Sequence, residues 1–239
     1  MHEIKTLSID NVMVSAAEGT TVLDAAREHG IDIPTLCHLD GLEDVGACRL
    51  CLVEAEGQNK LLPACVTRVE EGMSVKTQSP RLLKYRRMIL ELLFSERNHV
   101  CSVCGADGHC ELQTLARRAG MDHVRFDYLH PALTLDATHE RFVLDHNSCI
   151  LCTRCIRICD DVEGAHTLDT AGRACDTSLV TDMADTWSDA RSCTSCGKCL
   201  LVCPTGALFE KGSLPSEHHG KEEYLKYIVN AQRKMPWKR

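Results

Sequence analysis

A run of four cysteines with the spacing C-x2-C-x2-C-x3-C occurs twice in this chain and constrains its fold more than any other feature. The cysteines of the first run are Cys149, Cys152, Cys155 and Cys159, and those of the second are Cys193, Cys196, Cys199 and Cys203. This spacing is typical of thiolates that bind [4Fe-4S] clusters, and the fourth cysteine of each run binds the cluster of the other run. The fold must therefore bring the two runs together in space.

We expect each cluster to take three cysteines from one run and one from the other. The first predicted set is Cys149, Cys152, Cys155 and Cys203. The second predicted set is Cys159, Cys193, Cys196 and Cys199. Because iron held in this way changes its oxidation state, the pattern indicates a chain that handles electrons.

The cysteine content, 16 among 239 residues, is far above ordinary usage and calls for disulfides, zinc or iron-sulfur clusters. The N-terminal residues 1–5 lack the basic start and apolar core of a signal peptide, which disfavours disulfides and predicts a cytoplasmic chain. No apolar stretch approaches the roughly 20 residues that span a bilayer, so we expect no direct membrane insertion. The net charge of −7 makes nucleic acid a poor partner.

The pattern of residues 1–78 predicts a small mixed sheet with one helix. Residues 4–9 alternate like a strand, and residues 12–14 return as the second half of a hairpin. A helix follows, with Thr20 or Thr21 as its cap and Gly30 at its C-terminal end. Four further cysteines fall on the loops after this helix, with the spacing C-x10-C-x2-C-x13-C: Cys37, Cys48, Cys51 and Cys65.

This order of hairpin, helix and cysteine loop resembles the ubiquitin-like (β-grasp) [2Fe-2S] domain at the start of complex I's large iron-sulfur subunit and of several hydrogenases. The resemblance implies that the four loop cysteines bind a [2Fe-2S] cluster. Gly41 and Gly46 suit such a site, because small residues let backbone N–H groups approach the sulfides. Zinc is the alternative, since it also accepts a C-x2-C pair, but the outer two cysteines are not paired in that way.

Residues 79–139 are expected to form a helical module that begins with a Ser79 cap and Pro80 at the first helical position. Apolar residues then recur at helical spacing and predict one packing face: Leu82, Leu83, Tyr85, Ile89, Leu92, Leu93 and Phe94. Four candidate ligands follow this helix: His99, Cys101, Cys104 and Cys110. They resemble the module of one histidine and three cysteines that binds a [4Fe-4S] cluster in the complex I and iron-hydrogenase families.

Three histidines lie beside candidate ligands. Only Val100 separates His99 from Cys101, whereas the family usually places three residues there. His109 is therefore the rival of His99 for the fourth position. His38 is expected either to support the neighbouring ligands or to belong to the loop.

Residues 140–212 are expected to form the ferredoxin-type domain with two [4Fe-4S] clusters, and residues 213–239 a tail with a short amphipathic helix. Four cations lie close to the cysteine runs in sequence and either offset the charge of the clusters or lie in solvent: Arg154, Arg157, Arg191 and Lys198. Cys175 lies outside both runs and stays unassigned. The apolar positions of the predicted tail helix are Tyr224, Leu225, Ile228 and Val229.

The order of these three units resembles the N-terminal part of complex I's large iron-sulfur subunit over nearly the whole chain. It resembles more closely the family of diaphorase small (gamma) subunits of cytoplasmic NAD-reducing [NiFe] hydrogenases. Residues 41–51, 98–101 and 194–199 carry the closer resemblance. It implies an α+β fold with one [2Fe-2S] cluster and three [4Fe-4S] clusters.

The implied function is electron relay within a hydrogen:NAD+ oxidoreductase. The expected partners are a diaphorase large subunit that binds FMN and NAD, and the small and large hydrogenase subunits that hold the Ni-Fe site. No nucleophile with an adjacent base stands out in the sequence, so we expect no complete catalytic site on this chain. The alternatives are the same relay in an NAD-dependent formate dehydrogenase or a complex I-like enzyme, and a zinc-stabilised scaffold without redox work.

Overall fold

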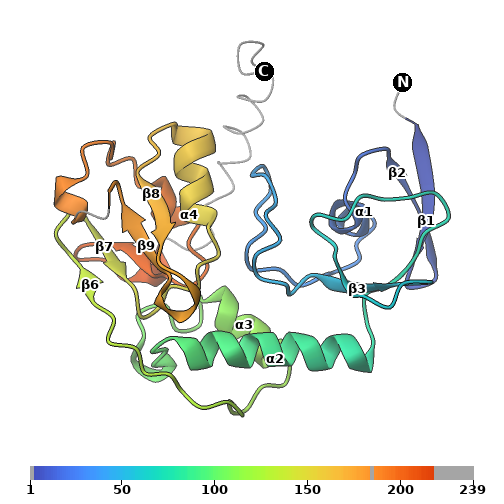
Figure 1. The fold of residues 1–239 in the computed structure, drawn as a ribbon, viewed down its shortest axis with the longest axis horizontal. Coiled ribbons are helices and arrows are strands. Elements are labelled where there is room, and N and C mark those ends of the chain that lie inside the picture. The colour runs from blue at the N-terminus through green and yellow to red at the C-terminus, as the bar shows by residue number, and fades with distance from the viewer. Residues whose placement is uncertain (1–2, 184–185, 218–239) are drawn as a thin grey trace.

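A five-stranded mixed sheet forms the N-terminal part of the molecule, with the strand order β2-β1-β5-β3-β4 (Figure 1). The computed structural model describes residues 3–183 and 186–217, so the predicted helix of the tail lies outside the described residues. The strands are β1 (Ile4–Ile9), β2 (Val12–Ala17), β3 (Leu52–Ala55), β4 (Leu62–Pro63) and β5 (Ser74–Lys76). Strands β1 and β2 pair antiparallel, which confirms the predicted hairpin, and β5 runs parallel to β1.

The turn and the helix of this part follow from local chemistry. Asp10 and Asn11 connect β1 to β2 with φ values of 49° and 66°, the left-handed conformation of a tight two-residue hairpin turn. Helix α1 (Val22–Glu28) is capped by Thr21, whose Oγ1 accepts a hydrogen bond from the Asp24 N–H at 3.1 Å. Gly30, with φ of 73°, lies just beyond the end of the helix as expected.

Helix α2 (Pro80–Glu96) links the sheet to the rest of the chain. Its start confirms the prediction, because Ser79 Oγ accepts a hydrogen bond from the Leu82 N–H at 3.1 Å and Pro80 occupies the first turn. The predicted packing face is only partly right. Leu82 and Phe94 are buried, but Leu83 and Leu92 are exposed, and so is Tyr85.

Two charged residues of α2 are buried in place of those exposed side chains. The guanidinium of Arg86 donates hydrogen bonds to the backbone carbonyls of Leu50 at 3.1 Å and Leu52 at 2.9 Å. Glu91 is fully enclosed by its ion pairs with Arg87 and Arg125. Hydropathy alone places both residues in solvent, and only partners from distant segments make their burial possible.

The middle of the chain shares an apolar core with the first part. A short 3-10 turn, η1 (Cys101–Val103), and helix α3 (Glu111–Arg118) follow α2. Leu90 and Phe94 of α2 and Leu112 of α3 pack with Leu36 and Leu50, which flank the cysteine loop of the first part. The two parts are thereby held together by side-chain packing.

The C-terminal part combines small sheets with short helical turns (Figure 1). One sheet has the order β10-β7-β6, with β6 (Leu135–Asp136), β7 (Phe142–Asp145) and β10 (Leu208–Glu210), and a second is the hairpin of β8 (Leu168–Ala171) and β9 (Ser178–Thr181). The helical elements are α4 (Arg154–Arg157), a π-helical turn η2 (Ile158–Glu163), α5 (Lys198–Leu201), and the 3-10 turns η3 (Ala174–Asp176), η4 (Trp187–Asp189) and η5 (Pro215–Glu217). Trp187 and Phe142 lie at the centre of its core, which also contains cysteines of both runs.

The loop between α1 and β3 reaches from the first part to the C-terminal part, where it lies beside α4 (Figure 1). Leu42 of this loop is buried in the core that contains Phe142 and Trp187, and Leu39 packs against it. The cysteine loop of the first part and the ferredoxin-type part are therefore in direct contact. No helix among the described residues is long and apolar enough to cross a membrane.

Candidate iron-sulfur sites

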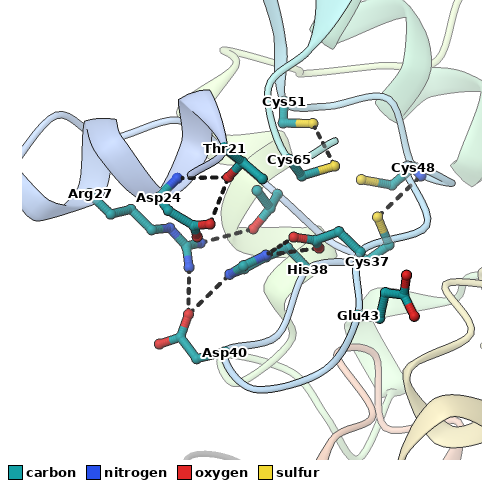
Figure 2. A network of polar contacts seen from close by, with 12 residues as sticks. Thr21, Asp24, Arg27, Cys37, His38, Asp40, Glu43, Cys48, Cys51 and Cys65 are labelled. Atoms are coloured by element: carbon teal, nitrogen blue, oxygen red, sulfur yellow. Dashed lines mark hydrogen bonds and ion pairs between the residues drawn. The ribbon is translucent and has the colours of Figure 1, made fainter. Parts of the chain in front are cut away.

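The four loop cysteines of the first part converge in two close pairs (Figure 2). The Sγ atoms of Cys51 and Cys65 lie 3.4 Å apart. The backbone N–H of Cys48 points to Cys37 Sγ at 3.5 Å, and that of Leu36 to Cys48 Sγ at 3.4 Å. Such N–H donors stabilise negative charge on sulfur, as a thiolate that binds iron requires.

The thiols of this site influence one another's protonation. Hydrogen bonds from Cys48 and Cys65 lower the pKa of Cys37. A hydrogen bond from Cys65 lowers the pKa of Cys51 to about 7. Two of the four sulfurs therefore favour the thiolate form, which is the form that binds metal.

His38 lies beside this site and belongs to a polar network that leads to α1 (Figure 2). Its Nδ1 lies 2.9 Å from a carboxylate oxygen of Asp44 and its Nε2 lies 3.0 Å from Asp40, which also binds Arg27. Burial lowers the pKa of His38, but the hydrogen bonds to Asp40 and Asp44 outweigh it and raise the pKa to about 8. Both ring nitrogens of His38 therefore contact carboxylates, and the residue braces the cysteine loop.

The four candidate ligands of the middle module line one cavity: His99, Cys101, Cys104 and Cys110. Burial lowers the pKa of His99 to about 4, so its ring is neutral at pH 7 and one ring nitrogen is free to bind metal. The buried Nε2 atom of His99 has no hydrogen-bond partner within residues 3–183 and 186–217. An unpaired buried nitrogen in a cavity with three thiols fits a metal ligand. His109 is exposed and does not line this cavity.

The two repeated runs line two separate cavities. The first is lined by Cys149, Cys152, Cys155 and Cys203. The second is lined by Cys159, Cys193, Cys196 and Cys199. The fourth cysteine of each run thus faces the cavity of the other run, as the spacing predicts. Cys175 lies on the exposed turn η3 and lines neither cavity.

Burial raises the pKa of four of these thiols, although the nearby charge of Arg154 opposes the effect at Cys152. It raises the pKa of Cys149 to about 11 and that of Cys152 to about 12, and it raises the pKa of Cys155 and Cys199 well above the ordinary value. Iron would supply the missing positive charge and take the place of the protons. The donor chemistry and the placement of four ligands around each cavity therefore fit iron-sulfur clusters.

The four cations near the runs lie in different surroundings. Arg154 and Arg157 are buried, so the alternative expectation that these side chains lie in solvent is wrong for both. Lys198 is half-buried in an ion pair with Glu163, whereas Arg191 is exposed. Both buried arginines lie on α4, where Arg154 directly precedes Cys155 and Arg157 follows it by two residues.

Sequence reasoning missed several side chains that contact the thiols. The indole Nε1–H of Trp187 points to Cys193 Sγ at 3.4 Å, and His139 Nε2 lies 3.9 Å from the same sulfur. Thr205, two residues after Cys203, lines both the middle cavity and the first ferredoxin cavity. Neither Trp187 nor His139 belongs to a cysteine run, so no local spacing indicates them.

Three protein-family models match consecutive parts of the chain. A 2Fe-2S iron-sulfur cluster binding domain matches residues 5–80, and the NADH-ubiquinone oxidoreductase-G iron-sulfur binding region matches residues 86–125. The ferredoxin-like domain of NADH-quinone oxidoreductase subunit 3 matches residues 141–209. The presence of [2Fe-2S]-type and ferredoxin-like iron-sulfur domains in a mixed α and β structure is thereby confirmed.

Curated relatives match most of the chain. The NADP-reducing hydrogenase subunit HndD of Solidesulfovibrio fructosivorans is 41% identical over 86% of this chain, and the mitochondrial NADH-ubiquinone oxidoreductase 78 kDa subunit of Candida albicans is 35% identical over 86%. The chain spans only 36% and 28% of the length of these two relatives. The gamma subunit of the NAD-reducing hydrogenase HoxS of Cupriavidus necator is 31% identical, and the match covers 95% of both chains.

A solved structure has the same fold over most of its length. It is a chain of the crystal structure of NAD+-reducing [NiFe]-hydrogenase in the H2-reduced state, with 35% sequence identity and a TM-score of 0.83. The match covers 88% of this chain and 88% of that chain.

Proposed function

Because this chain belongs to the family of gamma subunits of NAD-reducing hydrogenases, related to the large iron-sulfur subunit of complex I, we propose that it relays electrons between a flavin subunit and a hydrogenase module. The family resemblance expected from the sequence is thereby confirmed. The relatives are parts of multisubunit oxidoreductases, and this chain corresponds to one iron-sulfur subunit of such an enzyme.

One observation carries the proposal: three cavities are each lined by one complete set of candidate ligands. The sets come from residues that are up to 54 positions apart in sequence, as Cys149 and Cys203 are, so the fold itself assembles them. We assign three [4Fe-4S] clusters to these cavities and one [2Fe-2S] cluster to the cysteine loop of the first part. When bound, such clusters each accept and donate one electron without making or breaking a bond.

The assignment of individual ligands is part of the same proposal. Cys37, Cys48, Cys51 and Cys65 hold the [2Fe-2S] cluster. Cys51 and Cys65 form one close pair and Cys37 and Cys48 the other, so each pair would bind one side of such a cluster. His99, with Cys101, Cys104 and Cys110, holds the middle cluster, supported by the unpaired buried Nε2 atom. The two ferredoxin clusters take the two crossed sets of cysteines.

The mixed sheet of the first part supports a β-grasp fold for the [2Fe-2S] domain. Strands β1 and β5 run parallel at its centre, and β2 extends the sheet beyond β1. Residues of α1 are buried against the strands in one apolar core. We therefore propose an α+β chain with three domains, at residues 1–78, 79–139 and 140–212, and a tail at residues 213–239.

The proposed partners are a diaphorase large subunit with FMN and an NAD site, and small and large hydrogenase subunits with the Ni-Fe site, in the cytoplasm. The support for these partners is that the similar proteins are subunits of NAD-reducing hydrogenases. The same relay in a complex I-like enzyme or an NAD-dependent formate dehydrogenase is the second candidate, because the 78 kDa subunit of NADH-ubiquinone oxidoreductase is also similar. Nickel and flavin that co-purify with the chain would favour the hydrogenase.

The zinc scaffold is the competing function without redox work. Among the residues that the structure describes, no group of three or more His, Cys, Asp or Glu side chains lies close enough to hold a single metal ion. Ligands that are spread around an open cavity suit a polynuclear cluster better than one tetrahedral zinc ion.

The deciding experiment is anaerobic purification of the full chain, followed by assays of iron, acid-labile sulfide and zinc and by EPR before and after reduction. The proposal predicts roughly fourteen iron per chain and signals from both cluster types on reduction. Abundant zinc with little sulfide and no reducible signal would overturn the relay and leave the scaffold.

A further inference from the structure

A single buried guanidinium lies between two of the proposed cluster sites. Arg157, at the end of α4, is only 7% exposed although it carries a full charge. Its Nη1 donates a hydrogen bond to the backbone carbonyl of Glu43 at 2.8 Å. Its Nη2 donates to the carbonyls of Cys37 and, at 3.4 Å, Cys152.

These acceptors belong to two different sites. Cys37 and Glu43 lie on the loop that carries the proposed [2Fe-2S] ligands, and Figure 2 shows Glu43 near Cys37. Cys152 lines the cavity of the first ferredoxin set. Arg157 Nη2 is therefore one atom that contacts the backbone of a candidate ligand of each site.

The chemistry of arginine suits this bridge. A guanidinium is planar and carries five N–H donors in a fixed geometry, so it sets both the distance and the angle between the groups that it joins. The Nε–H also donates to Thr153 Oγ1 at 3.3 Å, which orients the plane from within its own turn. A lysine in its place would keep the charge but would not keep this fixed fork.

Apolar contacts bring the same two segments together. Leu42, on the loop between Cys37 and Cys48, is buried in the core that also contains Cys155 and Cys199. The burial of Leu42 stabilises the contact between the two segments but does not fix their relative orientation, because apolar burial is not directional. The hydrogen bonds of Arg157 are directional and therefore fix that orientation.

We propose that Arg157 is a positioning residue that fixes the separation between the [2Fe-2S] site and the cubane site of Cys149, Cys152, Cys155 and Cys203. The inference rests on the proposed relay function. One electron passes between the two sites in either direction, so that one is oxidised as the other is reduced, and no bond forms or breaks. Because electronic coupling falls with distance, a looser junction slows this transfer.

The test uses the full chain, purified anaerobically with its clusters, and the variants Arg157→Lys and Arg157→Gln. The first readout is the magnetic interaction between the two clusters when both are reduced, measured as relaxation enhancement of the [2Fe-2S] EPR signal. The second is the rate at which one electron, introduced by a light flash, redistributes between the clusters. Arg191→Lys and Arg191→Gln are the matched controls, since Arg191 is an exposed arginine of the same domain.

A positioning role predicts that both Arg157 variants weaken the magnetic interaction and slow the electron transfer several-fold, and that the Arg191 variants do neither. If only the charge of Arg157 matters, Arg157→Lys behaves like the unchanged protein and the proposal is overturned. Should Arg157→Gln fail to assemble, Arg157→Lys decides the matter, because it keeps the charge and most of the volume.

Iron content separates this inference from the function on which it rests. If the unchanged chain holds no reducible clusters, the relay function fails. If both Arg157 variants hold all their clusters and show an unchanged interaction and rate, the positioning role of Arg157 fails and the relay function stands.

Discussion

Arg154 and Glu111 form a two-point ion pair across the boundary between the middle module and the ferredoxin-type domain. Nη1 lies 2.6 Å from Oε1, and Nη2 lies 2.9 Å from Oε2. Glu111 directly follows Cys110, and Arg154 lies between Cys152 and Cys155. The pair therefore connects two of the proposed cluster sites and is of the strong, charge-assisted kind.

A backbone contact runs beside this ion pair. The N–H of Glu111 donates to the carbonyl of Pro204, which follows Cys203, at 2.8 Å. Cys110 of the middle site and Cys203 of the first ferredoxin site are thus joined through one hydrogen bond between adjacent residues. The ion pair holds this junction in place, because Arg154 is buried and cannot find water as another partner.

We expect Glu111→Gln to raise the midpoint potentials of the clusters on both sides of the junction. Reduction adds negative charge, and the nearby carboxylate opposes it, while the substitution leaves the positive charge of Arg154 uncompensated. Loss of the carboxylate should also cost about 3 kcal/mol of local stability, because it leaves a buried charge without its partner. EPR-monitored redox titration measures the potentials.

Glu18→Gln is the control, because Glu18 is an exposed carboxylate on the first part of the chain. It should leave the potentials of the clusters on both sides of the Arg154–Glu111 junction unchanged, since solvent and salt screen the charge of an exposed residue in another part of the chain. Potentials that stay the same or fall in Glu111→Gln would contradict an electrostatic role of the pair.

The middle site provides a direct test of its histidine ligand. His99→Ala should lose the middle cluster, so that iron falls by about four per chain while the other clusters remain. His99→Cys should keep the cluster but change its EPR signal and potential, because a thiolate replaces a neutral ring. Iron analysis and EPR of the reduced protein distinguish these outcomes.

His109→Ala is the matched control for this site. His109 is as close to the cysteines in sequence but is exposed and does not line the cavity. Its substitution should leave iron content and spectra unchanged. If His109→Ala loses the middle cluster and His99→Ala does not, the fourth ligand is His109 and the assignment of His99 is wrong.

Local patterns predict much of this fold because their physical causes are local. The Thr21 and Ser79 caps, the hairpin turn at Asp10 and the stop at Gly30 all depend on atoms within a few residues. The spacing of the cysteines in the two runs likewise predicts which of them group together. The sequence therefore indicates these features without knowledge of the distant chain.

The features that were missed depend on partners far along the chain. Arg86 and Glu91 are buried on α2 only because the carbonyls of Leu50 and Leu52 and the side chain of Arg125 meet them there. The contact of Arg157 with Cys37 spans 120 positions. Hydropathy and helical periodicity describe a residue and its neighbours on one helix, so they cannot indicate such contacts.

The crossing of the fourth cysteines can be tested by pairs of substitutions. Because Cys203 and Cys155 line the same cavity, Cys203→Ser and Cys155→Ser should damage the same cluster and leave the same spectra. Cys159→Ser and Cys199→Ser should in turn match each other. The missing EPR component of each reduced variant gives the comparison.

Cys175→Ser serves as the control for these four variants. Cys175 is exposed and lies outside all three cavities, so its loss should change neither the iron content nor the spectra. The crossed assignment fails if Cys203→Ser resembles Cys199→Ser instead of Cys155→Ser.

The buried carboxylate of Glu91 makes stability depend on pH. Burial raises the pKa of Glu91, but the hydrogen bonds and charges of Arg125 and Arg87 outweigh it and hold the pKa below the ordinary value of 4.5. A pKa that is lower in the folded state contributes stability above the ordinary value, and that contribution is lost as the pH falls through the folded pKa. The stabilising effect of the Glu91 ion pairs should therefore be constant from pH 7 to about pH 5 and decline in stronger acid.

Glu91→Gln should lower the free energy of unfolding by about 2 kcal/mol at pH 7, because the charge-assisted bonds to both arginines are lost. Thermal unfolding followed by circular dichroism measures the stability of the variant and of the unchanged protein at each pH. The difference between the two removes the acid sensitivity that both proteins share. Asp122→Asn is the control, since exposed Asp122 also binds Arg87 but its ion pair is screened by solvent and should contribute far less to stability. A difference between Glu91→Gln and the unchanged protein that persists undiminished below the ordinary glutamate pKa would contradict the role of the Glu91 charge in stability.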